Sequence, residues 1–403
     1  MLAIISTHPI QYQVPLWQAL ALDGRVPFEV WYLTDHGTRI SQDREFGRAF
    51  AWDIDTLSGY PHKFLDVAAA ASPGSFLKCR LRESLRRRLR SSGTEALWVQ
   101  GWQVAAYWQA VWEARAIGAE VWLRGESNDL APKALWKHGL KKLVLREFFQ
   151  RVDRFLYIGA ANRRLYQRYG VSDDNLYHAP YAVDNERFAR QADVLRGKRA
   201  EIRERWQIRE DAFCVLFCGK FISKKRPLDL VKAARLLIAT ERLPNIHLLF
   251  VGSGELAKDI RDACQVVVDA EAAGAETGNR GSALPKASFA GFLNQTTISW
   301  AYVAADCLVL PSDHGETWGL VVNEAMASGL PCIVSSACGC VEDLPRAAER
   351  SACYRFGDPE ALATALVAVN ARRPATNDLS DFCRRNSIAS TVQTVYACYK
   401  ARQ

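Results

Sequence analysis

Two glutamates in one short stretch of the chain have the chemistry and spacing to bind a long polar ligand. Glu316 and Glu324 lie within the segment from Asp306 to Leu344. If a helix begins at Gly319, Glu324 lies roughly 7.5 Å along its axis, at about 1.5 Å per residue. The two carboxylates are then too far apart to share one metal ion comfortably. We therefore expect them to contact hydroxyl groups at two separate places on one ligand.

The hydrophobic pattern predicts the elements that hold these glutamates. The apolar run Cys307–Leu310 is typical of a buried strand, and a helical pattern then runs from Gly319 to a stop at Gly329. A second apolar strand is predicted at Cys332–Val334. Open parallel sheets bind ligands at the loop after such a strand. The free N–H groups of Gly319 and Leu320 would face phosphate groups there.

A cluster of cations follows another predicted strand, Cys214–Cys218. It contains Lys220, Lys224, Lys225 and Arg226, between Gly219 and Pro227. A diphosphate leaving group carries negative charge that must be stabilised as its bond breaks, and lysines stabilise such charge without a metal ion. The alternative interpretation is a solvated basic turn.

These features resemble the signature of a known enzyme family. Glu316, Gly319, Glu324 and the Gly329–Pro331 stop resemble the Glu-x7-Glu signature of family 4 retaining glycosyltransferases (glycosyl transferases group 1) of the GT-B fold. The resemblance covers nearly the whole chain and is strongest from Gly219 to Leu344. It implies an α/β fold with two Rossmann-like domains facing across a cleft, and a C-terminal helix that crosses back to the N-terminal domain.

The resemblance and the alternation of strands and helices also suggest domain limits. The segment His178–Asn185 resembles the Val-Asp segment that closes the N-terminal domain of the family. We expect an acceptor-binding domain at residues 1–190 with the crossing helix at 387–403, and a nucleotide-sugar-binding domain at 191–386. The charged segment 186–205 is interpreted as a linker, and an insert without apolar periodicity at 268–286 as a surface loop.

Roles for the donor side are implied by the resemblance. The family holds the donor diphosphate with a Gly-Arg pair and a later Lys, so Gly219 and Lys220 stand for the pair and Lys225 for the lysine. Because the usual Lys-Gly is replaced here by Lys225-Arg226-Pro227, the register among Lys224, Lys225 and Arg226 stays open. The implied catalytic residues are Lys225, Glu316 and Lys220, and the implied donor-binding residues are Gly319, Leu320, Glu324, Phe292, Asn294 and Gly219.

Polar residues at predicted strand ends of the N-terminal half are candidates for the acceptor side. Many relatives place a histidine at the strand end where Gln100 stands in this sequence. Trp102, two residues further on, is a candidate for stacking on a sugar, although tryptophan more often fills a core. The acceptor-side candidates are His8, Gln11, Trp102, Arg124 and Glu126.

Three other interpretations compete with this one. Gly252, Gly254 and Ala257, followed by Asp269, fit a short dinucleotide-binding fingerprint and would indicate an NAD-dependent oxidoreductase. Asp53 and Asp55 form an Asp-x-Asp pair that a metal-dependent glycosyltransferase would use. A catalytically dead protein that binds sugar nucleotides is the third alternative.

The composition indicates an ordinary globular protein of 403 residues, with 49% hydrophobic and 24% charged residues. Its apolar stretches are too short to span a bilayer, and Met1–Ser6 is too short for a secretory signal. The 11 scattered cysteines suggest reduced thiols and a cytoplasmic protein. We expect no metal site and no cofactor, since a nucleotide-sugar is a substrate.

Part of the net charge of +8 is concentrated at Lys78–Arg90. Leu77, Leu81, Leu85 and Leu89 recur every four residues, which predicts an amphipathic basic helix. Its basic face is either simply solvated or attracted to an anionic membrane surface on the inner face of the membrane. No nucleic-acid-binding motif accompanies the charge.

Overall fold

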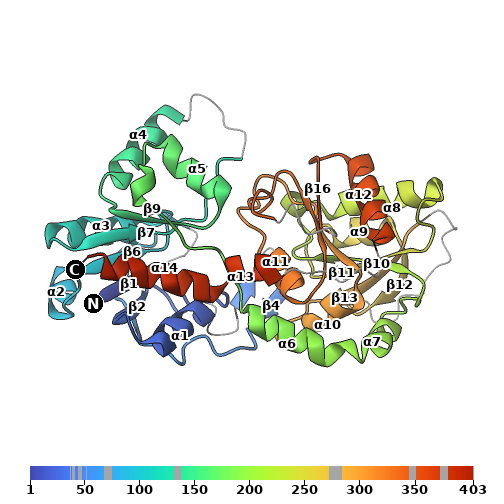
Figure 1. The fold of residues 1–403 in the computed structure, drawn as a ribbon, viewed down its shortest axis with the longest axis horizontal. Helices are drawn as coiled ribbons and strands as arrows, with labels where there is room; N and C mark the ends of the chain where they lie inside the picture. Colours follow the sequence, from blue (N-terminus) through green and yellow to red (C-terminus); the bar gives the residue numbers. More distant parts are fainter. Residues whose placement is uncertain are drawn as a thin grey trace. The chain divides into compact units, whose positions relative to one another are not determined.

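The structure is a computed structural model that describes residues 1–36, 38, 41–43, 48–50, 52–67, 75–130, 138–271, 284–344, 351–372 and 380–402. The chain divides into two compact units (Figure 1). Unit 1 comprises Met1–Ser41, Ile54–Val183 and Asn386–Gln403, and unit 2 comprises Gln42–Asp53 and Asp184–Arg385. The division therefore lies seven residues before the expected limit at residue 190. Within the described part of the chain, no helix has the length and apolarity needed to cross a membrane.

Unit 1 is built on a parallel sheet with the strand order β5-β2-β1-β6-β7-β8-β9. The strands run apolar and buried through the centre, as the sequence pattern predicts for a sheet covered on both faces. Their bounds are β1 Leu2–Ser6, β2 Phe28–Tyr32, β5 His62–Phe64, β6 Ala96–Val99, β7 Glu120–Leu123, β8 Arg154–Tyr157 and β9 Leu176–His178. Pattern reasoning missed β5 and β9, because these three-residue edge strands are only partly buried.

Helices cover both faces of this sheet. Ala3 and Ile5 point into one core, and the alternate residues Leu2 and Ile4 point into the other. The first core is closed by α2 (Arg86–Ser91), α3 (Ala105–Ala116), α4 (His138–Phe149) and α5 (Ala160–Arg168), and the second by α1 (Val14–Asp23) and α14 (Ile388–Lys400).

The C-terminal helix α14 belongs to unit 1, as expected for a helix that returns to the N-terminal domain. It has the predicted bounds Ile388–Lys400, and Ser387 caps its first turn through the Ser390 N–H. Val392, Val395 and Cys398 face the same core as α1. Figure 1 shows α14 running alongside α1.

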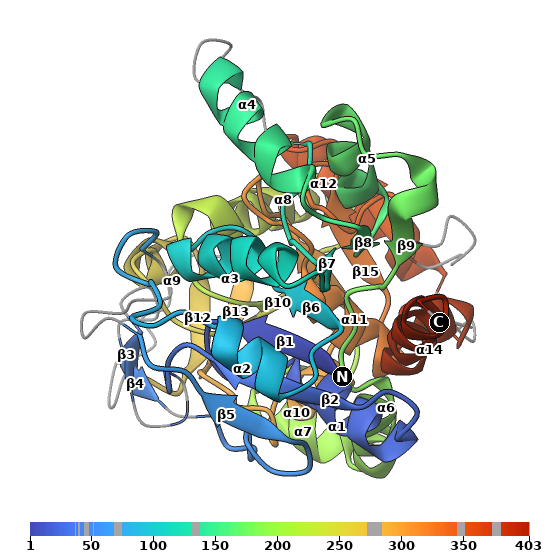
Figure 2. The ribbon, with the colours of Figure 1, turned by 90° about the vertical axis from the view of Figure 1, so that its left-hand side faces the viewer.

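The basic segment does not form the continuous helix predicted for Lys78–Arg90. Only α2 is helical, while Val67 and Leu81 form an isolated antiparallel bridge. Leu81, Leu85 and Leu89 are buried as the stripe predicts, but Leu77 is 76% exposed. Backbone N–H groups in this segment bond instead to the loop at Asp66 and to the side chain of Glu113, which breaks the helical pattern. Figure 2 shows α2 at the end of the sheet where the strands begin.

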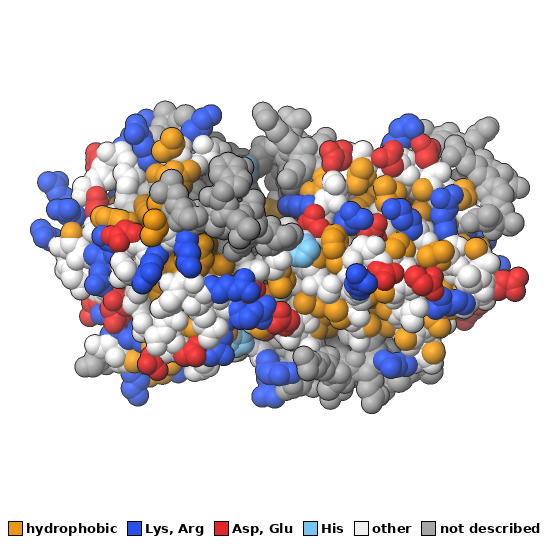
Figure 3. Space-filling model, turned by 90° about the horizontal axis from the view of Figure 1, so that it is seen from above, with side chains coloured by type: hydrophobic (Ala, Val, Ile, Leu, Met, Phe, Trp, Pro, Cys, Tyr) orange, Lys and Arg blue, Asp and Glu red, His pale blue; other side chains and the backbone are white. Residues whose placement is uncertain are grey.

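Surface charge is mixed on the face drawn in Figure 3. Lys and Arg side chains of the described residues lie among acidic and apolar ones there. Within the described chain, Arg115 pairs with Asp153 and Arg151 with Glu147. Exposed pairs of this kind contribute little stability, typically about 0 to 1 kcal/mol each.

Unit 2 contains a second parallel sheet, with the order β12-β13-β11-β10-β14-β15-β16. Its strands are β10 Phe213–Cys218, β11 Ile246–Val251, β12 Gln265–Asp269, β13 Lys286–Gly291, β14 Cys307–Leu310, β15 Cys332–Ser335 and β16 Ala352–Tyr354. The strand order reverses between β10 and β14, and such a switch point is where open α/β sheets bind ligands. β12 occupies the start of the predicted insert, and residues 272–283 lie outside the described part.

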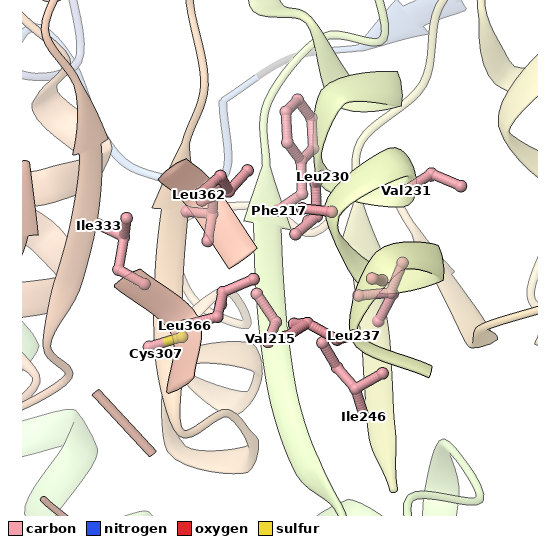
Figure 4. Packing of buried hydrophobic residues seen from close by; sticks show 14 of the residues in the cluster. Val215, Phe217, Leu230, Val231, Leu237, Ile246, Cys307, Ile333, Leu362 and Leu366 are labelled. Atoms are coloured by element: carbon pink, nitrogen blue, oxygen red, sulfur yellow. The ribbon is translucent and has the colours of Figure 1, made fainter. Parts of the chain in front are cut away.

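The core of unit 2 lies between this sheet and the helices α8 (Pro227–Ala239) and α12 (Pro359–Ala371) (Figure 4). Val215 and Phe217 of β10 meet Leu230 and Leu237 of α8, and all four are buried. Each such side chain contributes about 1.5–3 kcal/mol relative to full exposure. This packing fixes the strand ends from which the loops of the site emerge.

Helices α6 (Asn185–Arg196) and α7 (Arg199–Arg205) occupy the charged segment that we interpreted as a linker. Asp184 caps α6 through the Arg187 N–H. Arg199 and Arg203 reach the buried Asp306 before β14. Because a buried carboxylate satisfies these cations, the charge that suggested a solvated linker packs inside the unit instead.

The other helices of unit 2 are α9 (Ala257–Asp262), α10 (Ser299–Ala304), α11 (Leu320–Ala327) and α13 (Ser380–Arg385), and β3 (Ser41–Asp43) pairs with β4 (Arg48–Phe50).

Candidate active site

Lys225 and Glu316 meet at the switch point of unit 2. Glu316 lies in the loop after β14, and its carboxylate forms an ion pair with the Lys225 ammonium and accepts a hydrogen bond from Ser312 at 3.2 Å. The Lys225 and Glu316 side chains are 20% and 12% exposed. The structure therefore brings together two of the three predicted catalytic residues, Lys225 and Glu316, at a partly open position, while Lys220 lies in the loop after β10.

The contacts of the cation cluster indicate one register. Arg226 is held in the left-handed region at φ 50°, and its guanidinium pairs with Asp229 at 2.6 and 3.0 Å. Lys224 is exposed, and its carbonyl accepts the Asp313 N–H. Among the described residues, Lys225 is thus the member of the trio that reaches Glu316.

The helix α11 begins beside this pair. Gly319 has a φ of 108°, and a Cβ there would lie 2.5 Å from the Leu310 side chain. Only glycine enters the helix at this angle without strain. The N–H groups of Gly319 and Leu320 lie at the very start of the helix, where backbone N–H groups have no acceptor within the helix and carry its positive dipole end. The helix ends before Gly329, at φ 80°, as the sequence predicts.

Glu324 lies further along the same helix, α11. Its carboxylate accepts a 2.5 Å hydrogen bond from the Tyr302 hydroxyl. Burial raises the pKa of Glu324, while Tyr302 and the nearby Arg187 oppose that shift. A carboxylate held in this way accepts hydrogen bonds from neighbouring hydroxyl groups, as a ribose would require.

The glycine fingerprint after β11 has a packing explanation. A Cβ on Gly252 would lie 2.0 Å from the Gly219 carbonyl oxygen, and one on Gly254 would lie 2.7 Å from that of Phe221. The Phe221 N–H also donates to the Ser253 carbonyl at 2.8 Å. These glycines let the loop after β11 lie against the loop that carries Lys220.

The acid expected to complete a dinucleotide fingerprint has a different partner. Asp269 accepts two hydrogen bonds from Arg261, at 2.6 and 3.1 Å. Its side chain is 8% exposed. Together with the glycine packing, this geometry removes the main observations that favoured an NAD-dependent oxidoreductase.

Phe292 and Asn294 lie in the loop after β13. The Phe292 ring lies 6.5 Å from the Trp52 ring, at 46°. Asn294 caps the next turn, because its side-chain oxygen accepts from the Gln295 N–H and its carbonyl from the Thr297 N–H. Gln295, which follows directly, accepts hydrogen bonds from Arg187 of α6 through its carbonyl and its side-chain oxygen.

The Asp-x-Asp pair is divided between two local networks. The Asp53 carboxylate accepts the N–H groups of Gln295 and Thr296, each at 3.1 Å. The Asp55 carboxylate accepts those of Leu57 and Ser58, at 2.9 and 3.2 Å. Both carboxylates therefore have backbone donors as partners, which is the geometry of loop caps.

At the corresponding strand ends of unit 1, Arg124 and Glu126 form a buried network with Tyr181. The Tyr181 hydroxyl donates to Glu126 at 2.5 Å, and Arg124 donates to the carbonyls of Ala179 and Pro180 at 3.3 and 2.8 Å. Burial raises the pKa of Glu126 and lowers that of Arg124. These groups follow β7 and line the edge where β1 and β6 also end.

The remaining candidates of unit 1 differ in their surroundings. His8 is packed edge-on against His36, and burial lowers its pKa to about 4, so it is neutral at pH 7. The Gln11 oxygen and the Gln100 nitrogen are buried without hydrogen-bond partners among the described residues. Trp102 packs over Gly125 and edge-on against Phe149, which are core contacts.

Sequence reasoning missed several residues that complete these networks. Tyr302, Gln295 and Arg187 surround Glu324, and Tyr181 completes the unit 1 network. They lie on other elements of the chain, so spacing along the sequence does not reveal them. Gln295 carried the one available signal, since it directly follows Asn294.

Part of the chain matches a known protein family. Residues 212–371 match the family described as Glycosyl transferases group 1. D-inositol 3-phosphate glycosyltransferase of Geodermatophilus obscurus is 31% identical over 248 residues, covering 59% of this chain and 50% of that protein. UDP-Gal:alpha-D-GlcNAc-diphosphoundecaprenol alpha-1,3-galactosyltransferase of Escherichia coli is 27% identical over 158 residues, covering 39% of this chain and 35% of that protein. The chain thus spans half or less of these relatives' length.

Solved structures share the fold at much lower identity. Alr3699/HepE of Anabaena, in complex with UDP and glucose, matches with a TM-score of 0.66 and 13% identity, over 99% of both chains. This similarity supports the fold class predicted from sequence. Residues 212–371 of the chain therefore match the family described as Glycosyl transferases group 1, and the chain has the GT-B fold.

Proposed function

We propose that the protein is a glycosyltransferase that moves a sugar from a nucleotide-sugar donor to an acceptor. The observation that carries the proposal is the contact of Lys225 with Glu316 beside the N-terminus of α11, inside the family match. Cations, free N–H groups and a carboxylate at one strand edge suit a diphosphate joined to a sugar. The UDP complexes of the Anabaena structure agree with a nucleotide-sugar donor.

Lys220, Lys225 and the amides of Gly319 and Leu320 would stabilise the donor diphosphate. Their positive charge and partial charge would act on the leaving group as its bond to the sugar breaks. Metal independence is part of the proposal. It is supported by the backbone partners of Asp53 and Asp55.

The remaining proposed donor contacts lie at the same edge of the unit 2 sheet. Glu324 would accept the ribose hydroxyls, and Phe292 and Asn294 would lie beside the base. Glu316 would contact the donor sugar and keep Lys225 in place through their ion pair. The screen of nucleotide sugars described below would identify the base and the sugar.

Transfer would proceed with retention of configuration. The acceptor oxygen attacks C1 of the sugar on the face from which the diphosphate departs, and the leaving phosphate oxygen takes the acceptor proton. The family signature supports this mechanism. Polar groups of unit 1, among them His8, Gln11, Arg124 and Glu126, would form the acceptor side, with Trp102 as a sugar-stacking candidate.

The proposed acceptor is a lipid-linked or cell-surface glycan intermediate of bacterial polysaccharide biosynthesis. The name of the E. coli relative, which includes a diphosphoundecaprenol acceptor, supports this class. A cytoplasmic protein in peripheral contact with the inner membrane face would meet such an acceptor. The segment Lys78–Arg90 stays the candidate contact, with Phe76 and Leu77 exposed beside it.

A screen of UDP- and GDP-sugars tests this function. Thermal stabilisation identifies the donor, and release of the free nucleotide with an acceptor mixture measures turnover. Stabilisation by one donor together with turnover in excess chelator is the expected result. Binding without turnover would indicate a catalytically dead protein, and turnover only with Mn²⁺ or Mg²⁺ would overturn metal independence.

A further inference from the structure

Asp53 holds the loop after β13 at two backbone positions. Its carboxylate accepts the N–H groups of Gln295 and Thr296 at 3.1 Å each, and also the Thr296 hydroxyl. Asp53 comes from the short segment Gln42–Asp53, which belongs to unit 2 although the chain around it belongs to unit 1. A carboxylate that accepts two adjacent N–H groups is a strong, directional cap, because hydrogen bonds to charged groups are stronger than hydrogen bonds between neutral groups.

Arg187 of α6 holds the same loop at Gln295. It donates to the Gln295 side-chain oxygen at 2.5 Å and to its carbonyl at 2.9 Å. The backbone N–H and carbonyl of Gln295 therefore both have charged partners, Asp53 and Arg187.

A second contact ties the same segment to the loop. The Trp52 ring lies 6.5 Å from the Phe292 ring. Trp52 and Asp53 thus contact the loop at both of its ends, Phe292 and Gln295–Thr296. The segment is placed to determine the position of the whole turn.

We propose that Asp53 is a positioning residue of the donor site, acting through the loop Phe292–Thr296. By fixing the backbone of Gln295 and Thr296, it fixes the turn that carries Phe292 and Asn294, the residues assigned to the donor base. Trp52 supports the same loop through Phe292. This inference rests on the proposed function, and it gives Asp53 a role that needs no metal ion.

Asp55 provides a matched control. It is the other acid of the same Asp-x-Asp pair, but its carboxylate caps Leu57 and Ser58 in unit 1. A metal-binding pair would lose function on substitution of either acid. A positioning role for Asp53 predicts that only one of them matters.

The experiment compares Asp53→Ala, Asp53→Asn and Asp55→Ala in the full-length protein. Amide hydrogen exchange follows the peptide around residues 292–298 without ligand, and calorimetry measures affinity for UDP and GDP. For Asp53→Ala we expect faster exchange in this peptide and about tenfold weaker nucleotide binding, the usual scale for losing a charged hydrogen bond. Turnover at saturating donor should change about twofold or less. Asp53→Asn, which keeps one acceptor, should show a smaller loss of affinity, and Asp55→Ala should match wild type in exchange of this peptide and in affinity.

Several results would overturn the inference. Wild-type exchange of the 292–298 peptide in Asp53→Ala, or faster exchange with unchanged nucleotide affinity, would show that Asp53 does not position the site. Equal losses in Asp53→Ala and Asp55→Ala, or binding that requires Mn²⁺, would indicate a metal pair. If the wild type binds neither UDP nor GDP, the proposed function fails and the donor-site role with it. The exchange data then still show separately whether Asp53 holds the loop.

Discussion

The carboxyl-terminal edges of the two sheets share one architecture and differ in chemistry. At the unit 2 edge, the loop after β10 carries Lys220, Lys224 and Lys225, and Glu316 pairs with Lys225. At the unit 1 edge, the Tyr181 hydroxyl donates to Glu126, and the side-chain amides of Gln11 and Gln100 each have a buried atom without a partner among the described residues. A parallel sheet only provides the place for a ligand. The side chains at the strand ends decide whether that ligand is a phosphate or a polyhydroxyl compound.

The comparison predicts its largest effect at Lys225. Replacing it by alanine removes the charge beside Glu316 and the leaving group, so kcat should fall by about 10²–10³-fold. The midpoint of thermal unfolding should change little, because the side chain is partly exposed. Nucleotide release with the donor found in the screen measures the loss.

Lys224→Ala is the matched control for this substitution. Lys224 is adjacent and exposed, and the ion pair with Glu316 is made by Lys225. Its activity should stay within about tenfold of wild type, since a solvent-screened charge acts weakly. A larger loss for Lys224→Ala than for Lys225→Ala would reverse the register of the cluster.

A smaller loss is expected from Gly252→Ala. The new Cβ would lie 2.0 Å from the Gly219 carbonyl oxygen, so the loop with Lys220 must move. Displacement by about 1 Å lowers catalysis by up to about 10²-fold. The ratio kcat/KM for the donor measures this effect.

Gly118→Ala separates the clash from backbone strain. Gly118 also has a positive φ, of 81°, but a Cβ there meets no atom within 4 Å. We expect some destabilisation and normal transfer for this variant. Detectable NAD binding that Gly252→Ala abolishes would instead restore the oxidoreductase interpretation.

The two edges also differ in how far they could be predicted from the sequence. The unit 2 edge was predictable because Glu316, Gly319 and Glu324 lie on one loop and the helix that follows it. On a single helix, the separation of two residues in the sequence determines their relative positions. Tyr302 reaches the Glu324 carboxylate from α10, and only the fold places it there. The unit 1 network joins residues as distant as Glu126 and Tyr181, so the strand-end rule predicted a location without its contacts.

The fold shows the same division between local and distant information. The buried central strands and α14 had their predicted positions, because apolar runs and helical periods are local signals. The prediction of one helix over Lys78–Arg90 was wrong at Leu85, where Glu113 of α3 accepts the backbone N–H. A tertiary hydrogen bond of that kind leaves no mark on the local pattern.

Gln100→Leu tests whether the unit 1 edge serves function at a cost in stability. The Gln100 side-chain nitrogen is buried without a partner among the described residues. Leaving such a group unsatisfied costs about 1–3 kcal/mol, so leucine should leave the unfolding midpoint unchanged or raise it. Transfer to acceptor should fall by about tenfold, the scale of one lost hydrogen bond, with unchanged donor affinity. Weaker donor binding, or a lower midpoint with normal transfer, would contradict this division of roles.

The smallest predicted effect is a pH dependence from Glu126. Burial raises its folded-state pKa above the unfolded value of about 4.5. Below that value both states are protonated and no penalty exists. As pH rises, the unfolded carboxyl ionises first, so stability falls between pH 4.5 and the raised pKa and stays lower above it. Glu126→Gln cannot ionise, so the midpoint of wild type relative to this variant should fall over the same range.

Tyr181→Phe sharpens the same prediction. The Tyr181 hydroxyl donates to Glu126 and favours its ionised form, so removing it should raise the pKa of Glu126 further. The loss of stability with rising pH should then extend to higher pH than in wild type. Thermal unfolding of the ligand-free proteins across pH 4 to 8 measures both differences. If wild type and Glu126→Gln change in parallel with pH, the Arg124 cation compensates for the buried carboxylate, and the unit 1 edge carries an ion pair instead of a neutral polar network.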